Sequence, residues 1–287
     1  MIKPSTFSIV AYDAFTQSWG VAVASKFPAV GAVVPWAKAG AGAIATQAFA
    51  NTSFGPIGLT HLANGQSAKQ TFKLLRESDP DFESRQIGIV DKNGDSFSFT
   101  GKKCYDFAGG ISKPGFAIQG NILAGEVVIN AIESAYIRSS GPLVDRLVAA
   151  LKAGDDAGGD KRGKQSAAVY VVKENGGYAS FNDRMVDYRV DDDPDPIRKL
   201  LDLVELYHLY FDESMEDEKL PITSIIADQL QQVLAKVSLI TTNSYSKDFL
   251  PALREFIGNE NFEDRVDFDK MTIDKPVFEY LIRRFNK

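Results

Sequence analysis

The segment TFSIVAYDAFTQSWGVAVAS, residues 6–25, predicts the first hairpin of a β-sheet. Polar and apolar side chains alternate from residue 6 to residue 9 and apolar residues continue to residue 11, which indicates a strand with a buried face. A turn follows at 13–18, and residues 20–25 continue with small and β-branched side chains that suit a partner strand. We therefore expect an antiparallel strand pair here.

Outward from this hairpin, strands and helices follow in blocks. We expect further strands at 30–34, 43–49, 85–90, 96–100, 115–119, 167–172 and 177–181, and helices at 55–63, 67–77, 124–139 and 142–153. Asn93-Gly94 marks the turn of one hairpin. Because the strands come in runs and do not alternate with single helices, the order favours a layered α+β domain over a doubly wound parallel sheet.

A second, smaller domain is expected in the C-terminal part. Apolar residues recur with helical spacing over 196–211, and 230–239 and 249–257 are further helix candidates. The acidic run DESMEDEK at 212–219 is typical of a solvated linker. We therefore divide the chain into a layered domain at 1–211 and a small, mostly helical domain at 212–287.

Composition excludes several functional classes. A net charge of −6 over 287 residues argues against a general nucleic-acid binder, which usually carries a basic stripe. Cys104 is the only cysteine, so disulfide frameworks and multi-cysteine metal sites are excluded, and His61 and His208 are the only histidines. No apolar run approaches the ~20 residues of a membrane span and no secretory signal is visible, so we expect a cytoplasmic protein.

Two local features have competing interpretations. The run Asp191–Asp195 could bind a hard cation such as calcium, or could form a solvated turn in which Asp195 caps a helix starting at Pro196. Cys104, close to two lysines, could be a reactive thiol or a buried structural cysteine. The turn and the buried thiol are the simpler explanations, and we expect no metal and no cofactor.

Three polar clusters interrupt otherwise apolar stretches. They are Thr46-Gln47 with Asn51-Thr52-Ser53, Gln119-Gly120-Asn121, and the loop at 158–166. Each follows a strand or precedes a helix, where hydrogen-bond donors can converge on a ligand. Each cluster alone could be a set of satisfied loop caps, but the three together favour one shared site for a small molecule.

Long and unusual strings in the sequence resemble one family. The strings are TFSIVAYD, GVAVASKFPAVGAVVPWAKAGAGAIATQAFANTSFGPIGL, QGNILAG, GGDKRGKQSAA and FNDRMVDYRVDDDPDPI. Spread over residues 5–210, they are similar to the bacterial and archaeal family called domain of unknown function 1028. The tail strings LREFIGNENFEDRV and IDKPVFEYLIRRF resemble a small module, named for peptidoglycan binding, that often follows that domain.

The resemblance implies the fold and chemistry of the N-terminal-nucleophile (Ntn) hydrolases, whose fold is a four-layer αββα sandwich. In that superfamily a Thr, Ser or Cys opens the first strand, and its own free α-amine acts as the base. Thr6 would be the nucleophile, with Ser5 as the weaker choice, and Lys38 would lower the pKa of the amine or hydroxyl by its charge. Five residues precede Thr6, so this chemistry requires cleavage before Thr6.

The same resemblance implies the rest of the site. Gln47 and Asn51 would donate hydrogen bonds to an oxyanion. Ser25 follows the second strand, where proteasome-like members have an aspartate. The implied sets are catalytic Thr6, Lys38, Asp160 and Ser166, and substrate-binding Ser25, Gln47, Asn51, Gln119 and Asn121.

Two functional hypotheses follow. The first is an Ntn-type amidohydrolase that cleaves a small amide-type C–N bond with Thr6. The second is a non-catalytic protein that keeps the Ntn fold and binds a small ligand in the same pocket without N-terminal processing. For both we expect a homo-oligomer and no nucleic-acid or membrane partner. Peptidoglycan is a doubtful partner, because no secretory signal is visible.

Overall fold

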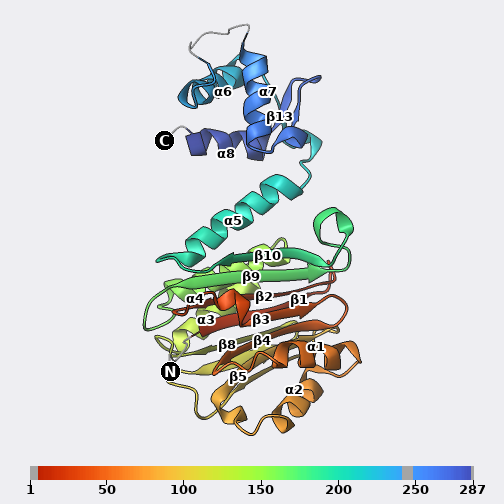
Figure 1. The fold of residues 1–287 in the computed structure, drawn as a ribbon, viewed down its shortest axis with the longest axis vertical. Coiled ribbons are helices and arrows are strands. Elements are labelled where there is room, and N and C mark those ends of the chain that lie inside the picture. The colour runs from red at the N-terminus through yellow and green to blue at the C-terminus, as the bar shows by residue number, and fades with distance from the viewer. Residues whose placement is uncertain (1–5, 241–247, 286–287) are drawn as a thin grey trace. The chain divides into compact units, whose positions relative to one another are not determined.

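The computed structural model describes residues 6–240 and 248–285 of the chain (Figure 1). It divides into two compact units, Met1–Val204 and Glu205–Lys287. The division falls within helix α5 (Pro196–Phe211), whereas the acidic run placed the boundary after residue 211. Within the described ranges, no helix is both long and apolar enough to cross a membrane.

The expected hairpin forms the middle of a six-stranded antiparallel sheet in the first unit. Its strands lie in the order β10-β9-β2-β1-β8-β7. Strand β1 (Thr6–Asp13) pairs with β2 (Ser18–Ser25) over its whole length, as the sequence predicts. The other strands are β7 (Gly109–Lys113), β8 (Phe116–Asn121), β9 (Ser166–Lys173) and β10 (Arg184–Val190).

A second sheet, of four antiparallel strands, packs against the first. Its strands, in spatial order, are β3 (Pro35–Lys38), β4 (Gly42–Ala48), β5 (Arg85–Asp91) and β6 (Ser96–Thr100). Strands β1 and β2 contact β4, and β8 contacts β5, so the sheets are stacked face to face. Val21 and Val23 of β2 share one buried apolar cluster with Ala43 and Ala45 of β4, because alternate side chains of each strand point between the sheets.

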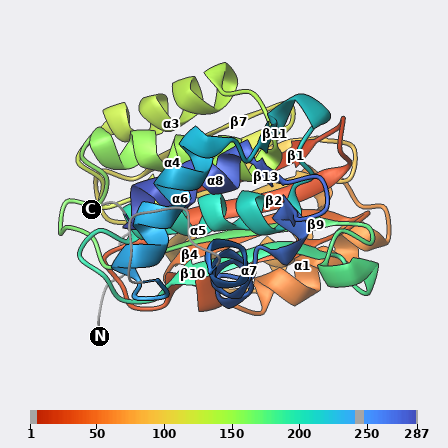
Figure 2. The same ribbon diagram turned by 90° about the horizontal axis from the view of Figure 1, so that it is seen from above.

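Helices cover the outer faces of both sheets. The four-stranded sheet packs against α1 (Phe54–Ala63) and α2 (Ala68–Glu77), and the six-stranded sheet packs against α3 (Glu126–Arg138) and α4 (Leu143–Asp156). Figure 2 shows α3 and α4 side by side, on the opposite side of the strands from α1. Helix α2 starts after Ser67, which forms a capping box with Gln70. The expected mixture of helices and sheets is thus confirmed.

Two of the predicted strands are wrong. Residues 30–34 contain a 3-10 helix, η1 (Val30–Ala32), in place of a strand. The hydroxyl of Ser166 accepts a hydrogen bond from the Val30 amide (3.1 Å) and donates one to the Phe27 carbonyl, so the segment curls around this side chain. The residues at 30–34 do not by themselves indicate a contact with Ser166, which is remote in sequence.

The second wrong strand is 177–181. It is a loop with a short 3-10 helix, η3 (Tyr178–Ser180), and the partner of β9 is β10, which begins at Arg184. Strand β10 lies at the edge of the sheet and is rich in charged side chains, so its sequence lacks the apolar signal of a central strand. Strands β3 and β7 also escape the sequence analysis. The remaining 3-10 helices are η2 (Phe82–Ser84), η4 (Glu216–Glu218) and η5 (Glu263–Arg265).

The second unit is mostly helical, as expected, but also contains a small sheet. Its helices are α6 (Ser224–Lys236), α7 (Phe249–Asn259) and α8 (Lys275–Phe285). Its sheet has the order β11-β13-β12, with strands β11 (Lys219–Pro221), β12 (Val266–Asp267) and β13 (Thr272–Asp274). Phe249, Leu253 and Phe262 are almost fully buried in a core made by this unit's own residues.

Candidate functional site

Four of the predicted site residues form a row across the six-stranded sheet. Thr6 on β1 is paired with Ser25 on β2 and with Asn121 on β8, and Ser25 is paired with Ser166 on β9. Residues directly opposite each other on neighbouring strands point to the same face of a sheet. All four are buried. The register therefore gathers polar side chains from four distant segments at one end of the sheet.

This row faces the four-stranded sheet. Ser8 lies two residues after Thr6 and so on the same face, and its hydroxyl donates a hydrogen bond of 2.6 Å to Oε1 of Gln47 on β4. Thr6 Oγ1 lies 3.2 Å from Ser25 Oγ, so the two hydroxyl groups share a hydrogen bond. Thr6 therefore places its hydroxyl at the end of the space between the two sheets.

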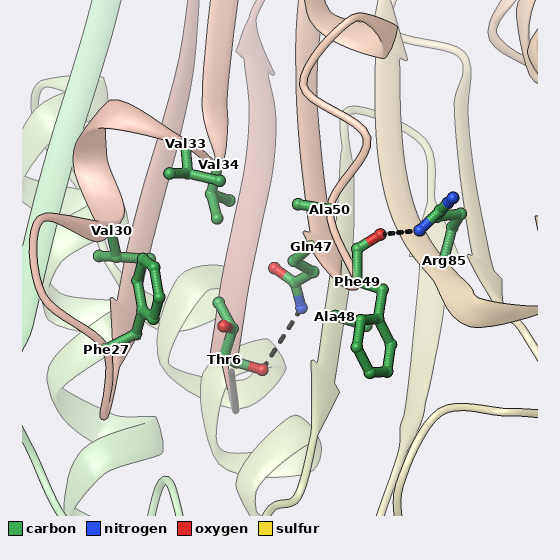
Figure 3. Close-up of a pocket in the computed structure, with 10 residues that line it drawn as sticks. All are labelled: Thr6, Phe27, Val30, Val33, Val34, Gln47, Ala48, Phe49, Ala50 and Arg85. Atoms are coloured by element: carbon green, nitrogen blue, oxygen red, sulfur yellow. Dashed lines mark hydrogen bonds between the residues drawn. The ribbon is translucent and has the colours of Figure 1, made fainter. Parts of the chain in front are cut away.

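A cavity of about 270 Å³ lies beside Thr6. Its polar side chains are Thr6, Gln47 and Arg85, and Figure 3 shows Thr6 and Gln47 close together in the middle of the site. The rest of the wall is apolar. It comprises Phe27, Val30, Val33, Val34, Ala48, Phe49 and Ala50. An apolar wall with a few placed polar groups is the usual form of a small-molecule site.

Both the oxygen and the nitrogen of the Gln47 side-chain amide form hydrogen bonds within the protein. Its Nε2 donates to the Thr6 carbonyl (3.3 Å), to the Gln119 carbonyl (3.3 Å) and to Oε1 of Gln86 (2.8 Å). Gln119 in turn donates from Nε2 to Oγ of Ser8 (2.6 Å). Gln47 and Gln119 are thus joined in a buried network between the sheets, and Gln47 also reaches the cavity wall.

Gln86, which the sequence analysis did not single out, is the centre of that network. Its Oε1 accepts hydrogen bonds from Gln47 Nε2 (2.8 Å) and Asn121 Nδ2 (2.9 Å). Its Nε2 donates to Thr100 Oγ1 and to the Gly120 carbonyl, both at 2.8 Å. One side chain therefore fixes the orientation of two amides that lie next to Thr6. The available signal was a glutamine at the start of the apolar strand QIGIV.

Arg85, also missed, forms one edge of the cavity and is held by acidic side chains. Its Nε donates to Asp79 Oδ2 (2.9 Å), its Nη1 donates to the Phe49 carbonyl (2.6 Å), and Asp81 lies 3.9 Å from its Nη2. The hydrogen bond from Arg85 lowers the pKa of the Asp79 carboxyl to about 2. The sequence hint was an arginine at the start of a strand, just after a segment that contains both aspartates.

Asn51 lies behind this edge and is not among the residues that line the cavity. Its Nδ2 donates to Asp79 Oδ2 (3.0 Å), and its Oδ1 accepts hydrogen bonds from the backbone and side chain of Ser53. The prediction that Asn51 donates to an oxyanion is therefore corrected, because its amide is used to orient Asp79 and to stabilise the start of α1.

Asp160 and Ser166 hold the backbone around the row. Asp160 Oδ2 accepts a hydrogen bond from the Lys26 amide (2.8 Å), and the Asp160 backbone bridges to Leu123. Lys26 follows β2 and Leu123 follows β8, so Asp160 joins the ends of the two strands that flank β1. Asp160, Ser25 and Ser166 also line a second, smaller cavity of about 100 Å³.

Lys38 lies far from Thr6, and its predicted role is corrected. It is an exposed residue at the end of β3, paired with Gly42 at the start of β4. Gln47, which contacts Thr6, is five residues further along β4. At ~3.3 Å per residue this separation is about 17 Å. Sequence order alone did not reveal that the β3–β4 turn points away from the row.

The remaining candidates have structural roles. Burial raises the pKa of the Cys104 thiol to about 11, which favours its protonated form at neutral pH. His208 on α5 pairs with Asp212, which directly follows that helix, and neither histidine lines the Thr6 cavity. Helix α5 starts at Pro196, as expected for a turn at 191–195, and the described residues contain no group of three or more side chains placed to hold a metal ion.

The second unit has a larger groove of about 590 Å³, lined mostly by charged side chains of β12, β13 and the loops beside them. The guanidinium of Arg254 lies 4.1 Å over the ring of Phe268. At its floor Arg265 forms a buried ion pair with Asp274 at 2.7 Å. The groove therefore offers charged groups of both signs and one aromatic face.

Comparisons with known proteins match both units. Residues 6–200 match the model of a family described as "Family of unknown function (DUF1028)", and residues 210–281 match one described as "Putative peptidoglycan binding domain". A crystal structure of protein SPO2555 from Silicibacter pomeroyi, of the same DUF1028 family, is similar at 30% sequence identity and a TM-score of 0.65. The similarity covers 71% of this chain and 89% of that chain. No curated protein matches the chain. The second match counts against the expectation that peptidoglycan is only a doubtful partner.

Proposed function

Because this chain belongs to the DUF1028 family, whose description leaves its function open, we propose a function from the site itself: an Ntn-type amidohydrolase that cleaves a small amide C–N bond with Thr6 as nucleophile. The observation that carries the proposal is the row of Thr6, Ser25, Asn121 and Ser166. It puts the hydroxyl of a strand-opening residue at a cavity suited to a small ligand.

The layers of the first unit support this proposal. Helices α3 and α4, the six-stranded sheet, the four-stranded sheet, and helices α1 and α2 follow one another, which is the layer order of the αββα sandwich of Ntn hydrolases. Thr6 opens a central strand of that arrangement. Because a fold hosts many activities, the site has to carry the functional argument.

The chemistry requires a base that the cavity wall does not offer. Among the described residues that line the cavity, none carries a carboxylate or an imidazole. Hydrolysis of the Ser5–Thr6 peptide bond would free the Thr6 α-amine, whose usual pKa of about 8 suits a base at neutral pH. A chain that is cleaved before Thr6 would therefore carry the missing base on the nucleophilic residue itself.

In the proposed reaction the Thr6 α-amine takes the proton of the Thr6 hydroxyl while Oγ1 attacks the amide carbonyl carbon. The proton then passes to the leaving nitrogen as the C–N bond breaks, and an amine departs. Water, activated by the same amine, hydrolyses the ester left on Oγ1. The products are one carboxylic acid and one amine, and the hydroxyl and the amine of Thr6 are restored.

Intact mass and N-terminal sequencing of the purified protein test this first. We expect a chain that begins at Thr6 and hydrolyses simple amides. Thr6→Ala should keep its N-terminal residues and lose turnover, while the control Ser5→Ala should still be cleaved. Turnover by a chain that retains residues 1–5 would rule out the free-amine mechanism.

A second candidate function is binding of a small ligand without catalysis. The observation that favours it is the state of the two amides expected at the oxyanion, because Gln47 and Asn51 already donate to other groups of the protein. An unprocessed chain whose Thr6→Ala variant binds a ligand as tightly as the parent would support it. A requirement for the Thr6 hydroxyl in turnover would exclude it.

We also propose that the second unit binds peptidoglycan through its charged groove, on the basis of the match over 210–281. Pull-down of the full chain with purified peptidoglycan tests this. Arg254→Ala should reduce retention, and Ile225→Ala, at an exposed site outside the groove, is the control. No retention of the parent protein would contradict the proposal. Formation of a homo-oligomer stays a prediction, to be measured by size-exclusion chromatography with light scattering.

A further inference from the structure

We propose that the Thr6 cavity selects amides that carry a short, uncharged aliphatic group, and that the valines of the 30–34 segment set this selectivity. The inference rests on the proposed function in one respect only, namely that the ligand is an amide. The aliphatic preference is argued from the wall of the cavity alone.

The wall is apolar on both sides of Thr6. Figure 3 shows Phe27 and Val30 on one side, Val33 and Val34 beyond them, and Phe49 on the opposite side. Apolar surface that leaves water on binding contributes about 25 cal/mol per Å², so such a wall favours hydrocarbon groups. A volume of about 270 Å³ lies just below the usual range for small-molecule sites, so the group it takes is short.

Arg85 has the only charged side chain among the described residues that line the cavity, and it is not available to balance a ligand charge. Arg85 already has Asp79 and Asp81 as partners, and one of its donors is used by the Phe49 carbonyl. A carboxylate on the ligand would therefore compete with two aspartates for one guanidinium. An ammonium group would find no carboxylate among the described lining residues. Burying either charge without a partner is costly, so both are selected against.

The valine wall is built rigidly. Ser166 bonds to the Phe27 carbonyl and the Val30 amide, and Gly31 lets the turn lie directly against Ala168 of β9, where an added Cβ would come within 2.6 Å. Ala29, at the start of η1, and Ala48, in the opposite wall, have φ angles of 50° and 66°. Non-glycine residues adopt this left-handed region at an energetic cost, and such positions cluster at ligand sites.

Ligand-observed NMR titration of the full chain with acetamide, butyramide and hexanamide tests the inference. Each methylene placed against the wall should tighten binding about fourfold until the cavity is full. Succinamate, which resembles butyramide but ends in a carboxylate, should bind at least tenfold more weakly than butyramide. Equal binding of all the amides, no binding, or tighter binding of succinamate would overturn the proposal.

A pair of variants assigns the selectivity to the valine wall. Val33→Phe places a ring in the cavity and should abolish the increase in affinity from acetamide to hexanamide. Ala32→Phe adds the same ring at an exposed, non-lining position of the same turn and should leave the series unchanged. If both variants retain the increase in affinity with the length of the amide, the wall does not select the ligand.

A third variant separates this inference from the proposed function. In Thr6→Ala the affinity should rise with the length of the amide as it does in the parent protein, because Thr6 contributes little to the apolar wall. Absence of turnover by the parent protein would contradict the proposed hydrolase while leaving the aliphatic selectivity intact. Loss of the length dependence in Thr6→Ala would contradict the selectivity itself.

Discussion

Gln86 shows how one side chain can organise a buried site. It is fully buried, and it joins Gln47 of one sheet to Asn121 of the other through the two lone pairs of a single oxygen. A buried polar group that loses its partner costs ~1–3 kcal/mol, so every member of such a network depends on the others. The network therefore fixes the register of the two sheets next to Thr6.

Replacing this side chain tests the network. Gln86→Leu should lower the free energy of unfolding by ~3 kcal/mol or more, because Asn121 Nδ2 loses the hydrogen bond that it donates to Gln86 and the Gly120 carbonyl loses the one that it accepts from Gln86. Urea denaturation measures the loss. The control Thr100→Val removes only one acceptor of Gln86 and should cost ~1 kcal/mol. A loss below ~1 kcal/mol in Gln86→Leu would show that the network is not a unit.

The ion pair behind the cavity predicts a pH dependence. Asp79 has its pKa lowered from 3.8 to about 2, chiefly by Arg85, so the folded protein favours the ionised form. The stability that this adds is fully present above the unfolded pKa near 3.8 and is lost as the pH falls towards 2. A shift of this size corresponds to ~2 kcal/mol.

Asp79→Asn should therefore lower the free energy of unfolding by ~2 kcal/mol at pH 7, and the deficit should shrink between pH 4 and pH 2. Denaturant titrations at pH 7, 4 and 3 measure this. Asp81→Asn, whose carboxyl is half exposed, is the control and should have a smaller effect. A deficit that stays constant down to pH 3 would mean that the pair acts through packing and not through charge.

At the scale of elements, α1 is fitted to β3 through a glycine. A Cβ on Gly55 would lie 2.0 Å from the Trp36 ring, so this helix and this strand approach each other only because position 55 lacks a side chain. The indole Nε1 donates to the Val33 carbonyl (3.0 Å), which ties Trp36 to the end of the valine wall. The contact thus links the outer helix to the cavity.

Gly55→Ala should destabilise the protein by ~1–3 kcal/mol through overpacking. Trp36→Leu in the same chain should recover part of the loss, which a double-mutant cycle by thermal unfolding would reveal. Gly258→Ala on α7 is the matched control, because its added methyl group would meet nothing closer than 3.7 Å. Equal effects of the two glycine replacements would show that helix propensity, and not contact with Trp36, decides the outcome.

Element prediction succeeded where the determining forces are local. The hairpin at 6–25, the helix predicted at 67–77 and the turn at Asn93-Gly94 are specified by neighbouring residues, and the structure has all three. The strand prediction at 30–34 was wrong because the group that bends this segment, the Ser166 hydroxyl, is remote in sequence. Strand β10 was not predicted because an edge strand tolerates charged residues, and a sequence rich in charged residues is also typical of a loop.

At the scale of the whole molecule, each unit has its own core. The core of the second unit is built from residues after Glu205, whereas an apolar cluster between the sheets and another beneath α1 and α2 belong to the first. Separate cores are the physical condition for separate unfolding transitions. The chain should therefore unfold in two steps in a calorimeter.

Phe262→Ala tests this independence. Phe262 is fully buried, so its truncation should destabilise the second unit by ~3–5 kcal/mol and lower one transition only. Phe54→Ala, at an equally buried phenylalanine in the first unit, should lower the other transition. A single transition that both variants shift equally would show that the units unfold together.

The sequence by itself determined the strand-first α+β order and the small helical second unit, because alternation, caps and turns act over a few residues. The polar residues Thr6, Ser25, Asn121 and Ser166 were implied by the family resemblance. Only the tertiary structure decided which of these side chains meet. Pairing across β8, β1, β2 and β9 aligns these four polar residues. Lys38 lies at the opposite end of its sheet from Gln47, because it pairs with the first residue of β4. Arg85 and Gln86 became visible only then, since the partners of a buried polar group are supplied by segments that the local sequence does not contain.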